Sequence, residues 1–229
     1  MQNAEGRRRD GDGSGRTAEE FTLVCFALNE EAAPFRRLGD RGPKAGILIT
    51  GMGRRNAERS LRAFLERRRP DRILSCGFAG GLNPPLKAGT VVFAAENNPR
   101  LEAGMAKAGA RRVRFHCADR VAATAVEKHA LWQATGADAV EMESQVLGTV
   151  CAESGIPFAI VRVILDTAGE DLPLDFSRLM TPDLRMSYGR LACALLESPG
   201  KIGALLALQR RSKAAAEALA LALAGVIEA

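Results

Sequence analysis

Carboxylate side chains follow three apolar runs of the sequence, at Glu31, Glu143 and Asp166. If those runs are strands of one sheet, the acids lie at the carboxyl ends of the strands, where open α/β sheets bind ligands. Carboxyl groups in such a place can donate or accept protons. The alternative is that each acid only begins a helix, where its charge complements the helix dipole. Because all three acids follow apolar runs in the same way, we favour a ligand site over three separate helix starts.

Glycine turns also follow apolar runs. Gly51 and Gly53 lead directly into a predicted helix, whose free backbone N–H groups favour an anion or a polar ligand. Gly77 and Gly80 let a backbone approach a ligand closely. The GxGxxG spacing of dinucleotide-binding turns is absent. We therefore expect no nucleotide cofactor.

The elements that would position these residues alternate along the chain. Continuous apolar runs predict strands at 21–28, 45–50, 72–82, 89–95 and 156–165, with weaker strands at 112–117 and 137–142. Helical patterns occupy 29–38, 56–69, 124–135, 143–155 and much of the chain from Ser177, ending in an Ala/Leu-rich helix at 201–227. Asn56 is the expected cap of the second helix. This alternation predicts one α/β domain, residues 21–229, with a mixed, mostly parallel central sheet flanked by helices. A disordered arm at 1–20 precedes it.

Composition excludes several classes of protein. The chain has 229 residues, 47% of them hydrophobic and 26% charged, as in soluble globular proteins. The polar N-terminus does not resemble a signal peptide, so a cytoplasmic location is expected. Five cysteines without a CxxC pair and two histidines predict neither a disulfide framework nor a metal site.

Basic residues concentrate in one part of the chain. The net charge is +5, and residues 36–72 alone carry twelve Lys or Arg against four Asp or Glu, a net +8. A solvated helix face explains this; a phosphate or an acidic membrane surface would also suit it. No aromatic residues are interleaved for base stacking, so nucleic acid is not expected as a partner.

Five ordered blocks carry a resemblance to a known family: FALNEEAAPF, ITGMGRRNAERSL, RILSCGFAGGLNPPLKAGTVV, ADAVEMES and IPFAIVRVILDTA. They resemble the purine nucleoside phosphorylase and nucleosidase superfamily, and within it the branch of methylthioadenosine/S-adenosylhomocysteine nucleosidase. The resemblance covers about residues 21–170. It implies a nucleoside phosphorylase-like fold, cleavage of the N-glycosidic bond of a purine nucleoside or nucleoside-like metabolite, and a homodimer or larger homo-oligomer. The Ala/Leu-rich helix could form that contact or pack on its own domain.

The resemblance also implies roles for single residues. Asp166 corresponds to the general acid that protonates the imidazole ring of the leaving purine, Glu31 to the acid that activates water, and Arg162 to its positioning partner. Glu143 corresponds to the carboxylate that binds the ribose hydroxyls, and Met142 packs on the sugar. The remaining predicted substrate-binding residues are Glu141, Phe78, Ala79, Gly80 and Val121. An acid, a base and a sugar clamp are what an oxocarbenium-like reaction needs.

Departures from the family pattern leave the substrate and the nucleophile open. Phe78 replaces a small hydroxyl residue, Leu165 a serine, and Val121 an aromatic residue that stacks on the base. Glu31 follows the first strand where the phosphorylases carry an arginine, which favours hydrolysis because a carboxylate repels phosphate. Phosphorolysis is the alternative, with Arg54 and Arg55 after the glycine turn as an anion site.

Two further alternatives differ in substrate or in class. The segment from LPLDFSRL onward and the short middle of the chain are similar to the hopanoid-associated phosphorylases of bacteria, which implies adenosylhopane as a substrate and a membrane surface as a neighbour. A degenerate nucleoside-binding protein, with the fold but without the chemistry, is the alternative of another class.

Overall fold

A computed structural model describes residues 20–39, 45–95, 98–174, 181 and 199–227. The predicted arm lies outside the described residues apart from residue 20. The predicted helical segment between residues 177 and 198 also lies outside them, apart from residue 181.

A single sheet of eight strands forms the centre of the molecule. The strands are β1 (Thr22–Phe26), β2 (Ala45–Ile49), β3 (Arg72–Gly81), β4 (Val91–Ala95), β5 (Arg111–Arg112), β6 (Phe115–Cys117), β7 (Ala139–Glu141) and β8 (Phe158–Asp166). Their order is β2–β1–β3–β8–β4–β5, with β7 paired to β3 and β6 to β7. Only the β4–β8 and β3–β7 pairs are antiparallel among the described strands. The prediction of a mixed, mostly parallel sheet is confirmed.

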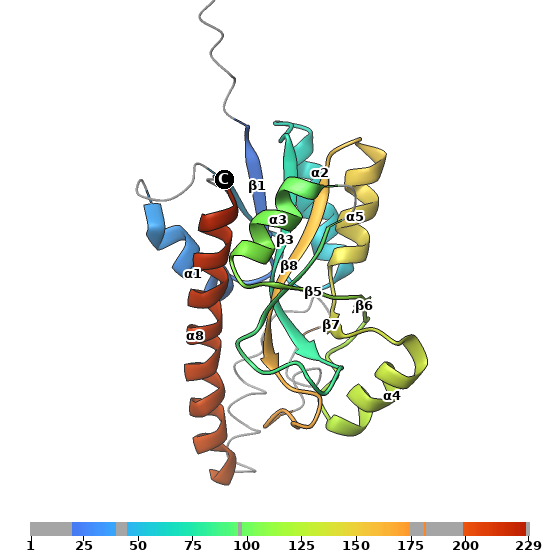
Figure 1. Cartoon of the computed structure of the whole chain (residues 1–229), viewed down its shortest axis with the longest axis vertical. Helices are drawn as coiled ribbons and strands as arrows, with labels where there is room; N and C mark the ends of the chain where they lie inside the picture. The colour runs from blue at the N-terminus through green and yellow to red at the C-terminus, as the bar shows by residue number, and fades with distance from the viewer. Residues whose placement is uncertain (1–19, 40–44, 96–97, 175–180, 182–198, 228–229) are drawn as a thin grey trace, which may run out of the picture.

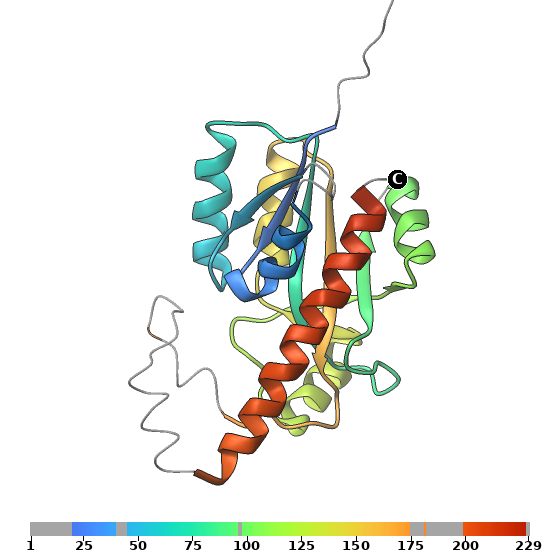
Figure 2. The ribbon, with the colours of Figure 1, turned by 90° about the vertical axis from the view of Figure 1, so that its left-hand side faces the viewer.

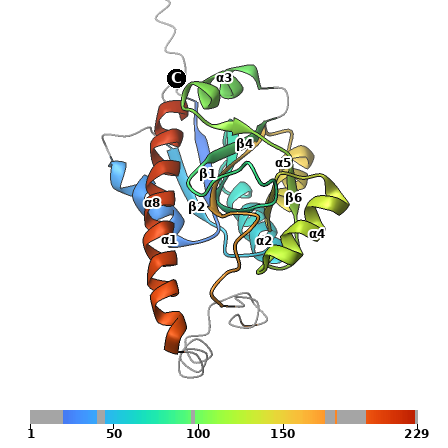
Figure 3. The ribbon, with the colours of Figure 1, turned by 60° about the horizontal axis from the view of Figure 1, so that its bottom comes forward.

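Helices cover both faces of this sheet. They are α1 (Asn29–Leu38), α2 (Arg54–Leu65), α3 (Pro99–Lys107), α4 (Ala125–Thr135), α5 (Ser144–Glu153) and α8 (Ile202–Ile227), with a short 3-10 turn, η2, at Pro199–Lys201. Figure 1 shows α1 and α8 together on one side of the sheet and α2 and α5 on the other. Figure 2, turned by a quarter, shows α8 running across its face of the sheet. Figure 3 shows α4 apart from both layers, near the ends of the central strands.

Burial explains this arrangement. Every residue of β1 is buried, because the strand lies between β2 and β3 with helices on both faces. One face of α8 is also buried, through Leu219, Leu223 and Val226 among others, and packs against α1 and β8. This long helix therefore packs on its own domain, one of the two roles that its composition allowed.

The structure differs from the predicted elements in three places. Asn56 does not cap α2, because the helix begins two residues earlier with Gly53, at φ +79°, as its N-cap. The helix α3 was not predicted, since its core contacts rest on the buried pair Leu101 and Met105 alone. The single strand expected at 112–117 is divided into β5 and β6, which pair with different neighbours.

Candidate active site

Glu31 is held on two sides by backbone N–H groups. Its Oε2 accepts a hydrogen bond from Leu28 N at the start of α1 (3.0 Å), and its Oε1 accepts one from Phe78 N on β3 (2.9 Å). The side chain is buried, at 5% exposure. Burial raises the pKa of Glu31, and the hydrogen bonds and the positive charge of Arg162 oppose that rise only in part. A buried carboxylate with a raised pKa is suited to accept a proton.

Gly77 has no side chain, and this leaves room for the Glu31 carboxylate to lie against β3. Its φ of +147° is unfavourable for residues with a side chain, and a Cβ added there would lie 2.7 Å from Glu31 Oε1. The sequence predicted that this glycine admits a close neighbour. In the structure the neighbour is the carboxylate of Glu31.

Arg162 lies on β8 directly opposite Gly77, with only 2% of its area exposed. Its Nη2 donates to Ser75 Oγ (3.0 Å) and to Glu141 Oε2 (2.7 Å), and lies 3.8 Å from Glu143 Oε2. Its Nε and Nη1 are buried and have no hydrogen-bond partner among the described residues. Buried guanidinium donors are normally satisfied, so these two groups suit a small ligand such as a water molecule.

Glu141 holds the start of α5 as well as Arg162. Its oxygens accept hydrogen bonds from Ser144 Oγ (2.6 Å), Ser144 N (2.8 Å) and Glu143 N (3.0 Å). Burial opposes ionisation, but Arg162 and these donors together lower the pKa of Glu141. This acid therefore has the helix-start role that the sequence left open as an alternative.

Glu143 directly precedes α5, but its side chain binds the N-terminus of a different helix, α2. Its Oε1 accepts a hydrogen bond from Gly53 N, the N-cap of α2 (2.8 Å). Burial raises the pKa of Glu143 to about 7, with Glu141 adding to the rise and Arg162 opposing it. The anion that the Gly51–Gly53 turn was expected to attract is thus found within the chain itself.

Arg54, which the phosphorolytic alternative placed beside that turn, is also engaged. Its Nη2 donates to the carbonyl oxygen of Cys117 (2.9 Å), and its Nη1 lies 3.3 Å from Asp119 Oδ1. These contacts direct the guanidinium toward the chain that follows β6.

Asp166 is the last residue of β8 and lies beside Gly80 of β3. A Cβ added to Gly80 would lie 3.5 Å from Asp166 Oδ2. The side chain is 8% exposed and forms an ion pair with the Lys128 ammonium of α4. Burial raises the pKa of Asp166, and Lys128 opposes the rise. The raised pKa agrees with a carboxyl group that donates a proton.

Lys128 is the site residue that sequence reasoning missed. It is fully buried, and its Nζ donates to the carbonyl oxygens of Thr167 (2.9 Å) and Glu170 (2.7 Å) as well as meeting Asp166. Its helix was predicted from the pattern at 124–135, but a lysine in a helix normally faces solvent. Nothing local in the sequence marks this one as buried.

The structure therefore gathers most of the predicted site at one edge of the sheet. Arg162, Glu141 and Glu143 form one connected group. Glu31 is bound to the backbone N–H of Phe78 and acts on Arg162 through its charge. The prediction of substrate contacts stays open for the other positions: Ala79, Gly80 and Met142 are buried or part-buried at the same edge, and Val121 is half-buried between β6 and α4.

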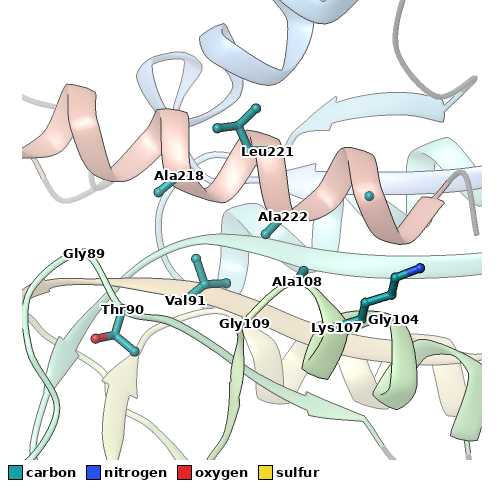
Figure 4. A pocket seen from close by; sticks show the side chains of 11 residues that line it. Gly89, Thr90, Val91, Gly104, Lys107, Ala108, Gly109, Ala218, Leu221 and Ala222 are labelled. Atoms are coloured by element: carbon teal, nitrogen blue, oxygen red, sulfur yellow. The ribbon is translucent and has the colours of Figure 1, made fainter.

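Two cavities lie away from this group. One, of about 770 Å³, lies between α3, α8 and the turn at Gly89, and Figure 4 shows its lining of small side chains with Lys107 at one end. The other, of about 1160 Å³, lies beside α5 and contains Arg54, Arg114 and His116. Of the predicted residues, Arg54, the anion site of the phosphorolytic alternative, lines the second cavity.

No cluster of three or more His, Cys, Asp or Glu side chains in the described part of the chain could hold a metal ion. None of its helices is long and apolar enough to cross a membrane.

The chain is similar to known proteins. The family model of the phosphorylase superfamily matches residues 35–97 and 93–197. A 5'-methylthioadenosine/S-adenosylhomocysteine nucleosidase of Geobacillus kaustophilus is 27% identical over 173 residues, which cover 61% of this chain and 74% of the relative.

Solved structures show the same fold. A nucleosidase of that name from Colwellia psychrerythraea, in complex with adenine, superposes with a TM-score of 0.68 at 17% identity, covering 92% of this chain and 95% of that one. Futalosine hydrolase of Helicobacter pylori gives a TM-score of 0.64 at 16% identity, covering 90% and 97%. At such identities the likeness is one of fold.

Proposed function

Because the chain belongs to the phosphorylase superfamily, we propose that it is an enzyme that hydrolyses the N-glycosidic bond of a purine nucleoside or a nucleoside-like metabolite. The observation that carries this proposal is the placement of two buried acids against one strand. Glu31 is anchored at Phe78, and Asp166 lies beside Gly80. Those anchor points are two residues apart, roughly 6.6 Å along a strand. Both carboxyl groups therefore lie near the same end of β3.

Each acid then has a distinct task. Glu31 accepts a proton from a water that the free Nε and Nη1 groups of Arg162 orient, and this water attacks the sugar carbon of the glycosidic bond. Asp166 donates a proton to the imidazole ring of the purine, so that the base leaves without negative charge. Glu143 accepts hydrogen bonds from the ribose hydroxyls and stabilises the oxocarbenium-like sugar.

Charge around Arg162 supports water rather than phosphate as the nucleophile. Glu31, Glu141 and Glu143 all act on this one guanidinium. A phosphate dianion placed there would meet three carboxyl groups around a single positive charge. The helix N-terminus of α2 cannot replace it, because the Glu143 carboxylate already accepts from Gly53 N.

The test is release of the free base from a panel of purine nucleosides, with and without millimolar phosphate. We expect the rate to be independent of phosphate, with free sugar as the product, and Glu31→Gln to lose about 10²–10⁴-fold in turnover. Strict dependence on phosphate, with sugar phosphate formed, would establish the phosphorylase alternative. Binding by thermal shift without turnover would instead identify a degenerate nucleoside-binding protein.

The substrate panel follows from the relatives. Methylthioadenosine and S-adenosylhomocysteine are the substrates named for the curated relatives, and futalosine hydrolase is a structural neighbour. We propose that this chain acts on one of these or on a nucleoside with another 5' substituent. A homo-oligomer and a cytoplasmic location stay predictions, which light scattering and cell fractionation test.

A further inference from the structure

The turn that follows Asp166 is closed by the side chain of Glu170. Glu170 Oε2 accepts hydrogen bonds from Thr167 N (2.8 Å) and from Thr167 Oγ1 (3.1 Å). The backbone closes the same turn, because Glu170 N donates to Thr167 O (3.2 Å). Asp166 is the last residue of β8, so Thr167 follows it directly. The direction in which the Asp166 carboxyl group points therefore depends on how Glu170 holds this turn.

Arg211 joins the turn to α8. Its Nη1 lies 2.7 Å from Glu170 Oε1, the oxygen that does not bind Thr167. From α4, Lys128 Nζ donates to the carbonyl oxygens of Thr167 and Glu170. Figure 1 shows the chain after β8 between α8 and α4. The turn behind Asp166 is thus held by two helices, and the Glu170 carboxylate is the group that connects it to α8.

Glu170 keeps its negative charge in this arrangement. Burial opposes ionisation, but the donors of Thr167 and Arg211 together lower the pKa of Glu170. The side chains of Glu170 and Arg211 are 40% and 39% exposed, so solvent weakens their mutual attraction. The Thr167 contacts are therefore the firmer part of the arrangement, and the ion pair with Arg211 supports them.

The charges of Glu170 and Arg211 also reach Asp166. Burial raises the pKa of Asp166, and Lys128 opposes that rise. The Glu170 carboxylate adds to the rise, because a second negative charge disfavours the ionised form of Asp166, and Arg211 opposes it. Glu170 thus favours the protonated form of Asp166, which is the form that can donate a proton.

We propose that Glu170 is a positioning residue for Asp166 in protonation of the leaving base, and that Arg211 of α8 holds Glu170 in place for this task. This inference rests on the proposed hydrolysis. Both residues act through Asp166 and need no contact with the substrate. The helix α8 then has a second task besides packing on the sheet.

The first experiment measures kcat/KM for a purine nucleoside in three variants. Glu170→Ala removes the contacts with Thr167 and Arg211 and should lose about 10-fold, because a small displacement of a catalytic group is costly. Arg211→Gln should lose less, about 3-fold, since a half-exposed ion pair contributes little. Arg210→Gln is the matched control. Arg210 is exposed, its Nε donates to Leu206 O of the same helix (3.4 Å), and its loss should leave the rate unchanged.

A double-variant cycle separates positioning from a general effect on the fold. If Glu170 acts through Asp166, adding Glu170→Ala to Asp166→Asn should cost little further activity. A residue that only stabilises the fold would cost the same factor in both backgrounds. Additive losses in this cycle would therefore overturn the inference.

A second readout needs no substrate. The carboxyl ¹³C signal of Asp166, assigned with Asp166→Asn, should titrate at lower pH in Glu170→Gln and at higher pH in Arg211→Gln than in the wild type. Both shifts should shrink at high salt, which screens exposed charges. Arg210→Gln should titrate as the wild type does.

Opposite shifts distinguish this inference from a loss of stability, which would not move the two titrations in opposite directions. Titrations that stay unmoved, or that move the same way in both variants, would overturn the inference. A protein that shows the opposite shifts but cleaves no nucleoside would instead refute the proposed hydrolysis, and the link of Glu170 and Arg211 to Asp166 would stand.

Discussion

At the scale of single residues, Asp166 forms an ion pair with Lys128, and in the proposed reaction it also protonates the leaving base. Asp166→Asn removes the proton donor, and we expect turnover to fall by about 10²–10⁴-fold. It also leaves the Lys128 ammonium buried without its counter-charge, which should lower the free energy of unfolding by about 3 kcal/mol. Assays of base release and urea unfolding measure the two effects.

The double variant Lys128→Met/Asp166→Asn serves as the control for that stability loss. Removing both charges should recover part of the free energy of unfolding without recovering turnover, because the two residues are in contact. Turnover near the wild-type level in Asp166→Asn would show that another group protonates the base.

Glu143 is the second residue whose proposed role makes a measurable difference. Its Oε1 is held by Gly53 N, and its Oε2 lies 3.8 Å from Arg162 Nη2. If this carboxylate binds the ribose hydroxyls, Glu143→Ala should reduce kcat/KM much more for ribosides than for 2'-deoxyribosides. Because the variant also removes the cap of α2, some loss should be common to both sugars. Equal losses on both would reduce Glu143 to that capping role.

At the scale of elements, β3 is the strand that brings the two acids together, and Gly77 is the position on which this depends. Gly77→Ala combines an unfavourable φ of +147° with a Cβ 2.7 Å from Glu31 Oε1. We expect a loss of stability of about 1–3 kcal/mol and a loss of activity, since Glu31 must move away from Phe78 N.

A second glycine separates the effect of backbone strain from the effect of displacing Glu31. Gly109 also has a positive φ, +78°, but a Cβ added there would meet nothing within 4 Å. Gly109→Ala should therefore lose stability while keeping kcat/KM. If Gly77→Ala were equally active, the contact between Glu31 and β3 would not be needed for the reaction.

The elements were largely predictable where burial leaves a clear pattern. The runs that became β1, β3 and β8 are apolar because both faces of these strands are covered, and the acids after them mark their ends. The start of α2 and the presence of α3 were not predictable in the same way. A glycine with positive φ can cap a helix as Gly53 does, and α3 shows too few core residues for a helical period.

The candidate site shows the same division. Glu31, Glu143 and Asp166 could be found from the sequence because each stands at the end of a predicted strand. Lys128 could not be found in this way, because its burial depends on α4 lying against the chain after β8. The hydrogen bond from Lys128 Nζ to Thr167 O joins residues that are 39 positions apart in the sequence. Long-range packing of this kind leaves no local periodicity.

At the scale of the whole molecule, the fold brings Glu31, Arg162, Glu143 and Asp166 to one edge of the sheet, and we propose that these groups direct water at a glycosidic bond. Hydrolysis in ¹⁸O-labelled water, in the presence of millimolar phosphate, tests this claim most directly. We expect that the released sugar, trapped at once by reduction, carries one ¹⁸O atom and that no sugar phosphate forms. Unlabelled sugar phosphate as the product would contradict it.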